Sequence, residues 1–402
     1  MTTTSDTIIR LISFSWKDWV VSIDEQTSVI GALRVDPNMP ATIRDLQAAG
    51  MLERMCGMVT GGDRGRTLAM VLGSGVDGST RPIVEKIGNL AGNLWYFRLS
   101  ADLHTNYRRM GAGFTKANFN PVPYAALIPK GPDAKTKPFG GAGATGIAGP
   151  ALSVPLWDQA QMVRHNQEIL AQYSNPIPGD LFAYLATLTI TQRREQAELL
   201  MGRPIVSIIA ASYRSGLPSR AQVITLAARQ YRLEPAMLAA FILAEQRDQS
   251  QNEDAVDYAA SQSMLVNRAT SIGLGQIVTT TAIREDLFSR LIDNPFRQSQ
   301  QRTQVADLLT SEEYNIFGVA KYIRLVADQA VGKTAAVLPQ TVSAFPRINF
   351  GAFGGDSATW PSDNIKALGS EYTSRAWDDK LSVGWGEFVF EAYRDIRSSR
   401  SF

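Results

Sequence analysis

The feature that most restricts the fold of this sequence is an apolar segment that ends in an acidic side chain. The segment begins at Leu233, reads LEPAMLAAFILAEQRD, and has Pro235 near its start. Proline is favoured in the first turn of a helix, where its missing N–H needs no partner, so a helix is predicted to begin here. Met237, Phe241 and Glu245 follow at intervals of four residues, which places them on one helix face. The sequence therefore predicts a carboxyl group in line with the apolar stripe of a buried helix.

A carboxyl group in this position has two interpretations. Burial disfavours the charged form and raises the pKa, as a general acid that works near neutral pH requires. Glycoside hydrolysis uses such an acid to protonate the leaving oxygen. Alternatively, Glu245 marks the point at which the helix leaves the core and meets solvent. The periodicity of the segment is compatible with both interpretations.

Two later motifs bear on this choice. The sequence reads GLGQI at Gly273–Ile277 and NIFGVAKYI at Asn315–Ile323. With the segment that ends at Glu245, they make residues 220–330 resemble the goose-type lysozymes and soluble lytic transglycosylases of the lysozyme-like superfamily. The resemblance implies an α-helical catalytic domain in which Glu245 is the general acid. It also implies cleavage of the β-1,4 bond between N-acetylmuramic acid and N-acetylglucosamine in peptidoglycan.

The GLGQI motif is expected to contribute to substrate binding. Gly273 and Gly275 permit a close approach of the backbone to a bound sugar. The amide of Gln276 offers both a donor and an acceptor to an N-acetyl group or a hydroxyl. The alternative interpretation of Gln276 is a polar turn residue with no contact to substrate.

The sequence departs from the lytic transglycosylases in one respect. Their Ala-Tyr-Asn-x-Gly motif is absent, and RINFGAFGGDSATWPSDN occupies residues 347–364 in its place. Simple hydrolysis is therefore preferred, with transglycosylation to 1,6-anhydro products as the alternative. A non-catalytic lysozyme fold, in a phage tail or a secretion machine, is the alternative from another class. The presence of Glu245 on an apolar helix face argues against it.

An acidic stretch follows the predicted catalytic helix and includes Asp248, Glu253, Asp254 and Asp257. In goose-type enzymes, acidic residues of this connection hold a water on the opposite sugar face. The oxygen ligands of Asp248, Gln249 and Glu253 also suit calcium, which takes six to eight oxygens from flexible loops. Glu371 is a further candidate ligand. A solvated acidic loop is the third interpretation, and the sequence leaves all three open.

The length and patterning of the chain predict two mainly α-helical domains. A chain of 402 residues exceeds one ordinary domain. We expect a helical N-terminal domain at 1–165, containing a Gly- and Pro-rich loop at 111–155, and a lysozyme-like catalytic domain at 166–402. No alternating strand pattern of useful length occurs. The glycine-rich stretch TGGDRGRT at 60–67 lacks the end of a phosphate-binding loop and is predicted to be a turn.

Composition excludes several other classes. The 40 basic residues nearly balance the 38 acidic ones and form no dense cluster, so nucleic acid is not an expected partner. The single cysteine, Cys56, rules out an internal disulfide. His104 and His165 are the only histidines that could activate it as a nucleophile. Cys56 is therefore expected to be an inert, partly buried residue.

The predicted substrate lies outside the cytoplasm, and the N-terminal sequence has no basic region followed by an apolar core, as a signal peptide would. A helical N-terminal half before a goose-lysozyme-like half with an acidic loop resembles the exported muramidase effectors of type VI secretion. This resemblance implies an antibacterial toxin that reaches the periplasm of target bacteria and binds calcium. It also implies the type VI secretion apparatus and a cognate immunity protein as partners. The sequence leaves peripheral contact with a membrane surface open.

Overall fold

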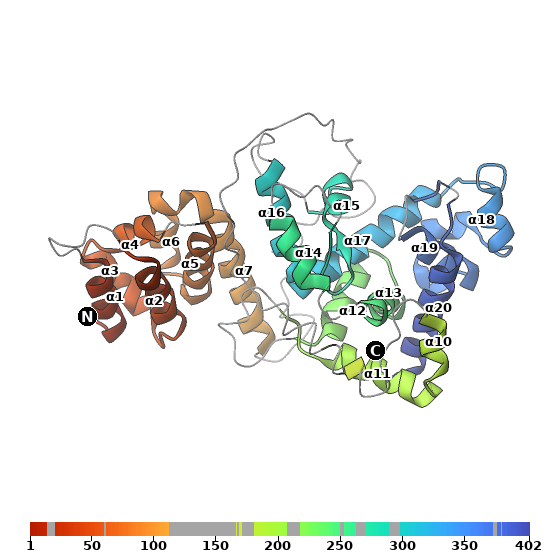
Figure 1. Ribbon diagram of the computed structural model, residues 1–402, viewed down its shortest axis with the longest axis horizontal. Helices are drawn as coiled ribbons and strands as arrows, with labels where there is room; N and C mark the ends of the chain where they lie inside the picture. The colour runs from red at the N-terminus through yellow and green to blue at the C-terminus, as the bar shows by residue number, and fades with distance from the viewer. Residues whose placement is uncertain are drawn as a thin grey trace. The chain divides into compact units, whose positions relative to one another are not determined.

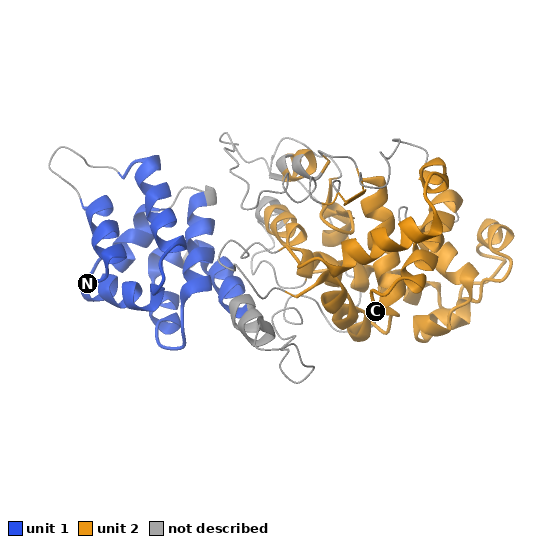
Figure 2. Ribbon diagram, turned by 90° about the horizontal axis from the view of Figure 1, so that it is seen from below, with its two compact units in different colours: residues 1–123, 208–217 blue, residues 124–207, 218–402 orange. Residues whose placement is uncertain are grey.

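The computed structural model describes most of the chain. The described residues are 1–13, 21–59, 62–111, 166, 169–170, 181–206, 218–249, 253–262, 270–288, 298–372, 376–378 and 380–402. The chain divides into two compact units, residues 1–123 with 208–217 (unit 1) and residues 124–207 with 218–402 (unit 2), as Figure 2 shows. The predicted domain boundary at 165/166 and nearly all of the predicted loop at 111–155 lie in a stretch outside the described residues.

Unit 1 is helical, as predicted for the N-terminal part of the chain (Figure 1). Its elements are α1 (Thr3–Ile12), α2 (Ile23–Arg34), α3 (Met39–Ala48), α4 (Leu52–Met58), α5 (Gly62–Gly75), α6 (Arg81–Glu85), the 3₁₀ helix η1 (Gly88–Asn93) and α7 (Leu94–Gly111). The predicted turn at 60–67 is wrong, because α5 begins at Gly62. Packing decides this, since α5 lies against α7 so closely that a Cβ on Gly73 would meet the carbonyl oxygen of Phe97 at 2.3 Å. Tertiary contact here outweighs the low helix propensity of glycine.

Cys56 is buried in α4, which supports the expectation that it is inert. Burial, and secondarily the nearby charge of Glu53, raises the pKa of its thiol to about 12. The thiolate is the nucleophilic form, so almost none of the reactive species exists near neutral pH.

Unit 2 is also mainly α-helical, which confirms the predicted fold class. Its elements are α10 (Leu181–Ala186), α11 (Ile190–Gly202), α12 (Arg220–Gln230), α13 (Pro235–Asp248), α14 (Glu253–Gln262), β1 (Ser271–Ile272), β2 (Ile277–Val278), α15 (Thr279–Arg284), α16 (Gln298–Thr310), α17 (Glu312–Ala330), α18 (Pro339–Ala344), η3 (Phe350–Gly354), η4 (Ser357–Thr359), α19 (Ser362–Tyr372) and α20 (Val383–Ser398). The two short strands pair antiparallel, with Ser271 opposite Val278 and Ile272 opposite Ile277. None of the helices within the described residues is long and apolar enough to cross a bilayer.

Helix α13 lies in the interior of unit 2 and contacts α11, α12, α17 and α20 (Figure 1). It begins at Pro235, as predicted. The expected apolar stripe on one face is wrong, however, because every residue from 236 to 247 is buried. Alanines at four of these positions keep the helix narrow enough for its neighbours to approach from several sides. A helix covered all round fits the core of a larger domain rather than its surface.

Two buried ion pairs hold the helices around α13. Arg220 of α12 donates to Glu312 of α17 at 2.8 and 2.6 Å. Arg247 of α13 donates to Asp395 of α20 at 2.8 Å, and Arg193 of α11 binds the same carboxylate at 2.9 Å. Each of these pairs joins helices that lie far apart in the sequence.

Candidate active site

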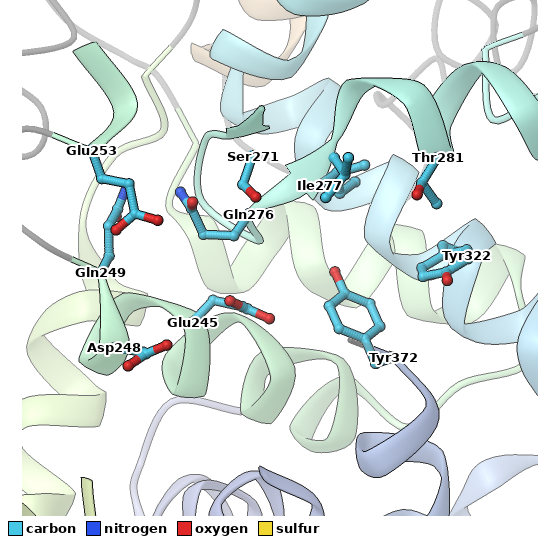
Figure 3. Close-up of a pocket in the computed structure, with 11 residues that line it drawn as sticks. Glu245, Asp248, Gln249, Glu253, Ser271, Gln276, Ile277, Thr281, Tyr322 and Tyr372 are labelled. Carbon is cyan, nitrogen blue, oxygen red and sulfur yellow. The ribbon is translucent and has the colours of Figure 1, made fainter. Parts of the chain in front are cut away.

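Unit 2 contains a pocket of about 240 Å³ at the end of α13 (Figure 3). This volume lies just below the roughly 300–1,000 Å³ that is usual for ligand pockets. The pocket is therefore suited to a short segment of a long polymer. Four structural elements form most of its wall: the end of α13, the β1–β2 hairpin, α17 and α19. The lining residues are Glu245, Asp248, Gln249, Glu253, Ser271, Gln276, Ile277, Val278, Thr281, Tyr322 and Tyr372.

Glu245 reaches this pocket from the last turn of α13 while remaining 9% exposed. Figure 3 shows its carboxyl group between Asp248 and Tyr372, with Gln276 across the pocket. Burial raises the pKa of Glu245 well above its usual value, and the negative charges of Asp248 and Glu253 raise it further. Within the described residues no donor forms a hydrogen bond to this carboxyl group, which leaves its proton available to a bound molecule. The site therefore places a carboxyl group with a raised pKa in contact with the pocket, as general acid catalysis requires.

The pocket also brings together three of the four predicted calcium ligands. Asp248, Gln249 and Glu253 lie together on the same side of it (Figure 3). Burial raises the pKa of Asp248, and the charge of Glu253 adds to this effect. In the part of the chain that the structure describes, no three His, Cys, Asp or Glu side chains converge closely enough to form a metal cluster by themselves. This end of the pocket is thus acidic and rich in oxygen, with two carboxylates and one amide.

Glu371, the fourth predicted ligand, does not line the pocket. It is fully buried in α19, and one carboxylate oxygen accepts a hydrogen bond from the backbone N–H of Trp377. The sequence suggested Glu371 because of its acidic side chain, but the position within α19 turns that side chain to the chain that follows the helix. The structure gives it a local contact and does not bring it to Asp248.

Gln276 lies at the tip of the hairpin and lines the pocket opposite Glu245 (Figure 3). Its backbone has a φ of 45°, a left-handed conformation that is uncommon for residues other than glycine. Its N–H and its side-chain amide both donate to the carbonyl of Gly273, at 3.0 and 2.8 Å. Strained residues of this kind often occur at ligand sites, where the surrounding structure holds them in place.

Gly273 and Gly275 do not line the pocket, and the structure shows a packing reason for both. Gly273 has a φ of 79°, and a Cβ there would meet the carbonyl oxygen of Leu309 at 2.2 Å. A Cβ on Gly275 would meet a methyl group of Val319 at 2.3 Å. Their lack of side chains lets the hairpin lie directly against α16 and α17, whereas the sequence suggested a close approach to a sugar.

A substitution at Gly275 tests this packing. We expect Gly275→Ala to lower the free energy of unfolding by about 1–3 kcal/mol, because the added methyl group overlaps Val319 of a buried helix. Gly202→Ala is the matched control, since nothing lies within 4 Å of a Cβ at that position near the end of α11. Urea unfolding measures both variants. Equal stability of the two would contradict the proposed close packing of the hairpin.

Two tyrosines complete the pocket, and neither was singled out by the sequence. Tyr372 donates from its hydroxyl to the carbonyl of Gly275 at 2.9 Å, and its ring packs edge-on against Phe241. Burial raises the pKa of Tyr372 well above its usual value, with a further contribution from the charge of Glu245. Tyr322 lies beside it, with ring centroids 5.3 Å apart. The available signal was the position of Tyr322 in the NIFGVAKYI motif and of Tyr372 in the last helix before the C-terminal one.

The pocket thus places a carboxyl group with a raised pKa, carried by a buried helix, opposite a polar turn that is held by neighbouring helices. Such a site within a mainly α-helical domain is that expected of a glycan-cleaving enzyme of the lysozyme-like class. Two family models match the chain: the N-terminal domain of the type VI secretion system (T6SS) peptidoglycan muramidase Tse3 at residues 2–104, and the catalytic domain of the same family at residues 139–328. The peptidoglycan muramidase Tse3 of Pseudomonas aeruginosa is 40% identical over 409 aligned positions, covering 98% of this chain and 97% of that protein. The chain belongs to the Tse3 family of peptidoglycan muramidases.

Proposed function

We propose that the chain is an N-acetylmuramidase, a glycoside hydrolase that cleaves the β-1,4 bond between N-acetylmuramic acid and N-acetylglucosamine in peptidoglycan. The observation that carries this proposal is the carboxyl group of Glu245, which is buried, has a raised pKa and faces the pocket. Its place in the Tse3 family gives the substrate class. Membership of a muramidase family also favours this proposal over a non-catalytic lysozyme fold.

In this mechanism Glu245 donates its proton to the glycosidic oxygen as the bond to the leaving sugar breaks. Positive charge then develops on the ring of the other sugar, as in an oxocarbenium ion. The carboxylates of Asp248 and Glu253 line the same pocket, and they are assigned below to calcium instead of to the attacking water. The amide of Gln276, across the pocket from Glu245, is proposed to bind a hydroxyl or an N-acetyl group of the glycan.

The products distinguish hydrolysis from the alternative, lytic transglycosylation. A hydrolase adds water and leaves reducing N-acetylmuramic acid ends, whereas a transglycosylase leaves 1,6-anhydro ends. We expect mass spectrometry of muropeptides released from purified peptidoglycan to show reducing ends. The absence of the Ala-Tyr-Asn-x-Gly motif of the lytic transglycosylases favours hydrolysis. Anhydro ends as the main product would overturn the proposal of hydrolysis.

We further propose that calcium binds at the acidic end of the pocket, with ligands from Asp248, Gln249 and Glu253. Calcium takes oxygen ligands from carboxylates, amides, backbone carbonyls and water, so this set suits it. The pKa of Asp248 is raised first by burial and then by the negative charge of Glu253, and a bound cation would favour the charged form of Asp248. When bound, the ion would neutralise that charge and fix the connection after α13.

A pair of substitutions tests the calcium site. We expect calcium at about 100 times its Kd to add about 2.7 kcal/mol to the stability of the wild type. The double variant Asp248→Asn/Glu253→Gln should lose this stabilisation, because both charged ligands are gone. Glu198→Gln is the control, since Glu198 is half-buried, accepts from the backbone N–H of Arg400 and does not line the pocket. Calorimetric titration with calcium chloride and urea unfolding, each with a chelator control, measure the effect. Binding that survives in the double variant would refute this site.

The family further supports a proposal for delivery and partners. We propose that the chain is an antibacterial effector that the type VI secretion apparatus delivers to the periplasm of target bacteria. A cognate immunity protein is proposed to protect the producing cell. Competition between a producing strain and a neighbour with or without that immunity protein tests both statements. Contact with a membrane surface stays a prediction, which sedimentation with lipid vesicles can test.

A further inference from the structure

Gln246, the residue after the catalytic acid, is buried and bridges two walls of the pocket. Its side chain is 2% exposed. Its amide nitrogen donates to the carbonyl of Leu274 at 2.9 Å and to the side-chain oxygen of Gln249 at 2.9 Å. Its amide oxygen accepts from the side-chain nitrogen of Asn166 at 2.5 Å. One buried amide therefore connects the helix of the acid with the backbone of the hairpin.

The same hairpin is held from two other helices. Asn315 of α17 accepts from the N–H of Gly275 at 2.7 Å and donates to the carbonyl of Ile272 at 2.9 Å. Tyr372 of α19 donates to the carbonyl of Gly275 at 2.9 Å. Of these three side chains, only Gln246 belongs to the helix that carries Glu245. It therefore sets the distance between the acid and the turn directly.

The geometry points to Gln246 as a positioning residue that holds the strained turn, and with it Gln276, at a fixed place opposite Glu245. Gln276 is two residues from Leu274 and has a left-handed backbone with a φ of 45°. Such a conformation costs about 1–3 kcal/mol and persists only where surrounding contacts enforce it. Loss of the bond from Gln246 lets the turn move away from the acid. The inference rests on the proposed roles of Glu245 and Gln276 in glycan cleavage.

A double-mutant cycle separates this role from a general effect on stability. Gln246→Met keeps the length of the side chain but removes its hydrogen bonds. We expect it to lower kcat/KM on soluble peptidoglycan fragments by about 10–100-fold, because a displacement of about 1 Å in a site can cost that much. In the Gln276→Ala background the same substitution should cost less than about threefold, since the residue that it positions is already gone. The pH profile should keep its shape, because no charge changes.

Gln196→Met is the matched control. Gln196 is equally buried, but its amide bonds Tyr184 and Arg247 at 2.6 and 2.7 Å and does not touch the turn. Its effect should be the same in both backgrounds. Gln246→Asn, which keeps the amide on a shorter side chain, takes the place of Gln246→Met if that variant does not fold. All rates are measured at two calcium concentrations, one near the Kd of the wild type and one in excess.

Three other outcomes would each overturn the inference. An equal loss from Gln246→Met in both backgrounds would make Gln246 a structural residue only. If excess calcium restores the full rate of Gln246→Met, the substitution acts through Gln249, a proposed calcium ligand, and not through the turn. A wild-type rate for Gln276→Ala alone would remove the proposed substrate role of Gln276 and the positioning role with it. Glu245 is tested independently of all three results.

Discussion

Replacing Glu245 with glutamine is expected to lower the rate of peptidoglycan cleavage by about 10²–10⁴-fold, the usual contribution of a general acid. Glutamine keeps the size and polarity of the side chain but has no acidic proton to give to the glycosidic oxygen. The fold should be preserved, because no described residue donates a hydrogen bond to the carboxyl group that is lost. The release of muropeptides from purified peptidoglycan measures the rate.

The same variant should show a dependence of stability on pH that confirms the raised pKa. The folded state holds the proton of Glu245 more tightly than the unfolded state, whose pKa is about 4.3. Stability of the wild type is therefore lost as the pH rises from the unfolded pKa through the folded pKa. Glutamine has no such loss, so Glu245→Gln should match the wild type in stability near pH 4 and exceed it near pH 8, where the unfolded wild type has released this proton. Urea unfolding in the presence of chelator measures this difference.

Glu387→Gln is the control for both measurements. Glu387 pairs with Lys366 on the surface of α19 and α20 and does not line the pocket. It should change neither the rate of cleavage nor the shape of the stability curve. If Glu245→Gln cleaves peptidoglycan as fast as the wild type, Glu245 is not the general acid.

Local patterns were enough to predict the helix that carries the acid. Pro235 marks its start, and the spacing of apolar residues places Glu245 in the core. The motif GLGQI drew attention to two glycines, which the structure shows packed against neighbouring helices instead of lining the pocket. These features depend on residues a few positions apart, so a sequence contains them directly.

The features that depend on distant residues could not be predicted in this way. Tyr372 reaches the hairpin across 97 positions, and Asn315 does so across 40. Glu371 is the opposite case. It is next to Tyr372 in the sequence, but its side chain bonds the backbone of Trp377 and does not line the pocket. The all-round burial of α13 likewise depends on how its neighbours pack. Side-chain direction and long-range contact decide each case, and neither follows from composition or spacing.

The largest expected effect on stability comes from one of these long-range contacts, the ion pair between Arg220 and Glu312. Their side chains are 2% and 0% exposed. Arg220 also donates to the carbonyl of Leu200, and Glu312 accepts from the N–H of Val206 at 3.1 Å. The transfer of a charge from water to the protein interior costs free energy, and a buried charge that loses its partner has nothing to offset that cost. We therefore expect Arg220→Met to lower the free energy of unfolding by about 3–5 kcal/mol.

The double variant Arg220→Met/Glu312→Gln distinguishes charge from packing. Glutamine removes the stranded charge while its amide oxygen can still accept from Val206, so the double variant should recover at least about 2 kcal/mol of the loss. Arg394→Met is the control, because the pair of Arg394 with Glu391 is largely exposed and such pairs contribute about 0–1 kcal/mol. Urea unfolding measures all three proteins. A double variant no more stable than Arg220→Met would mean that lost packing, not an unpaired carboxylate, causes the damage, and that α12 and α17 are held together by their apolar contacts.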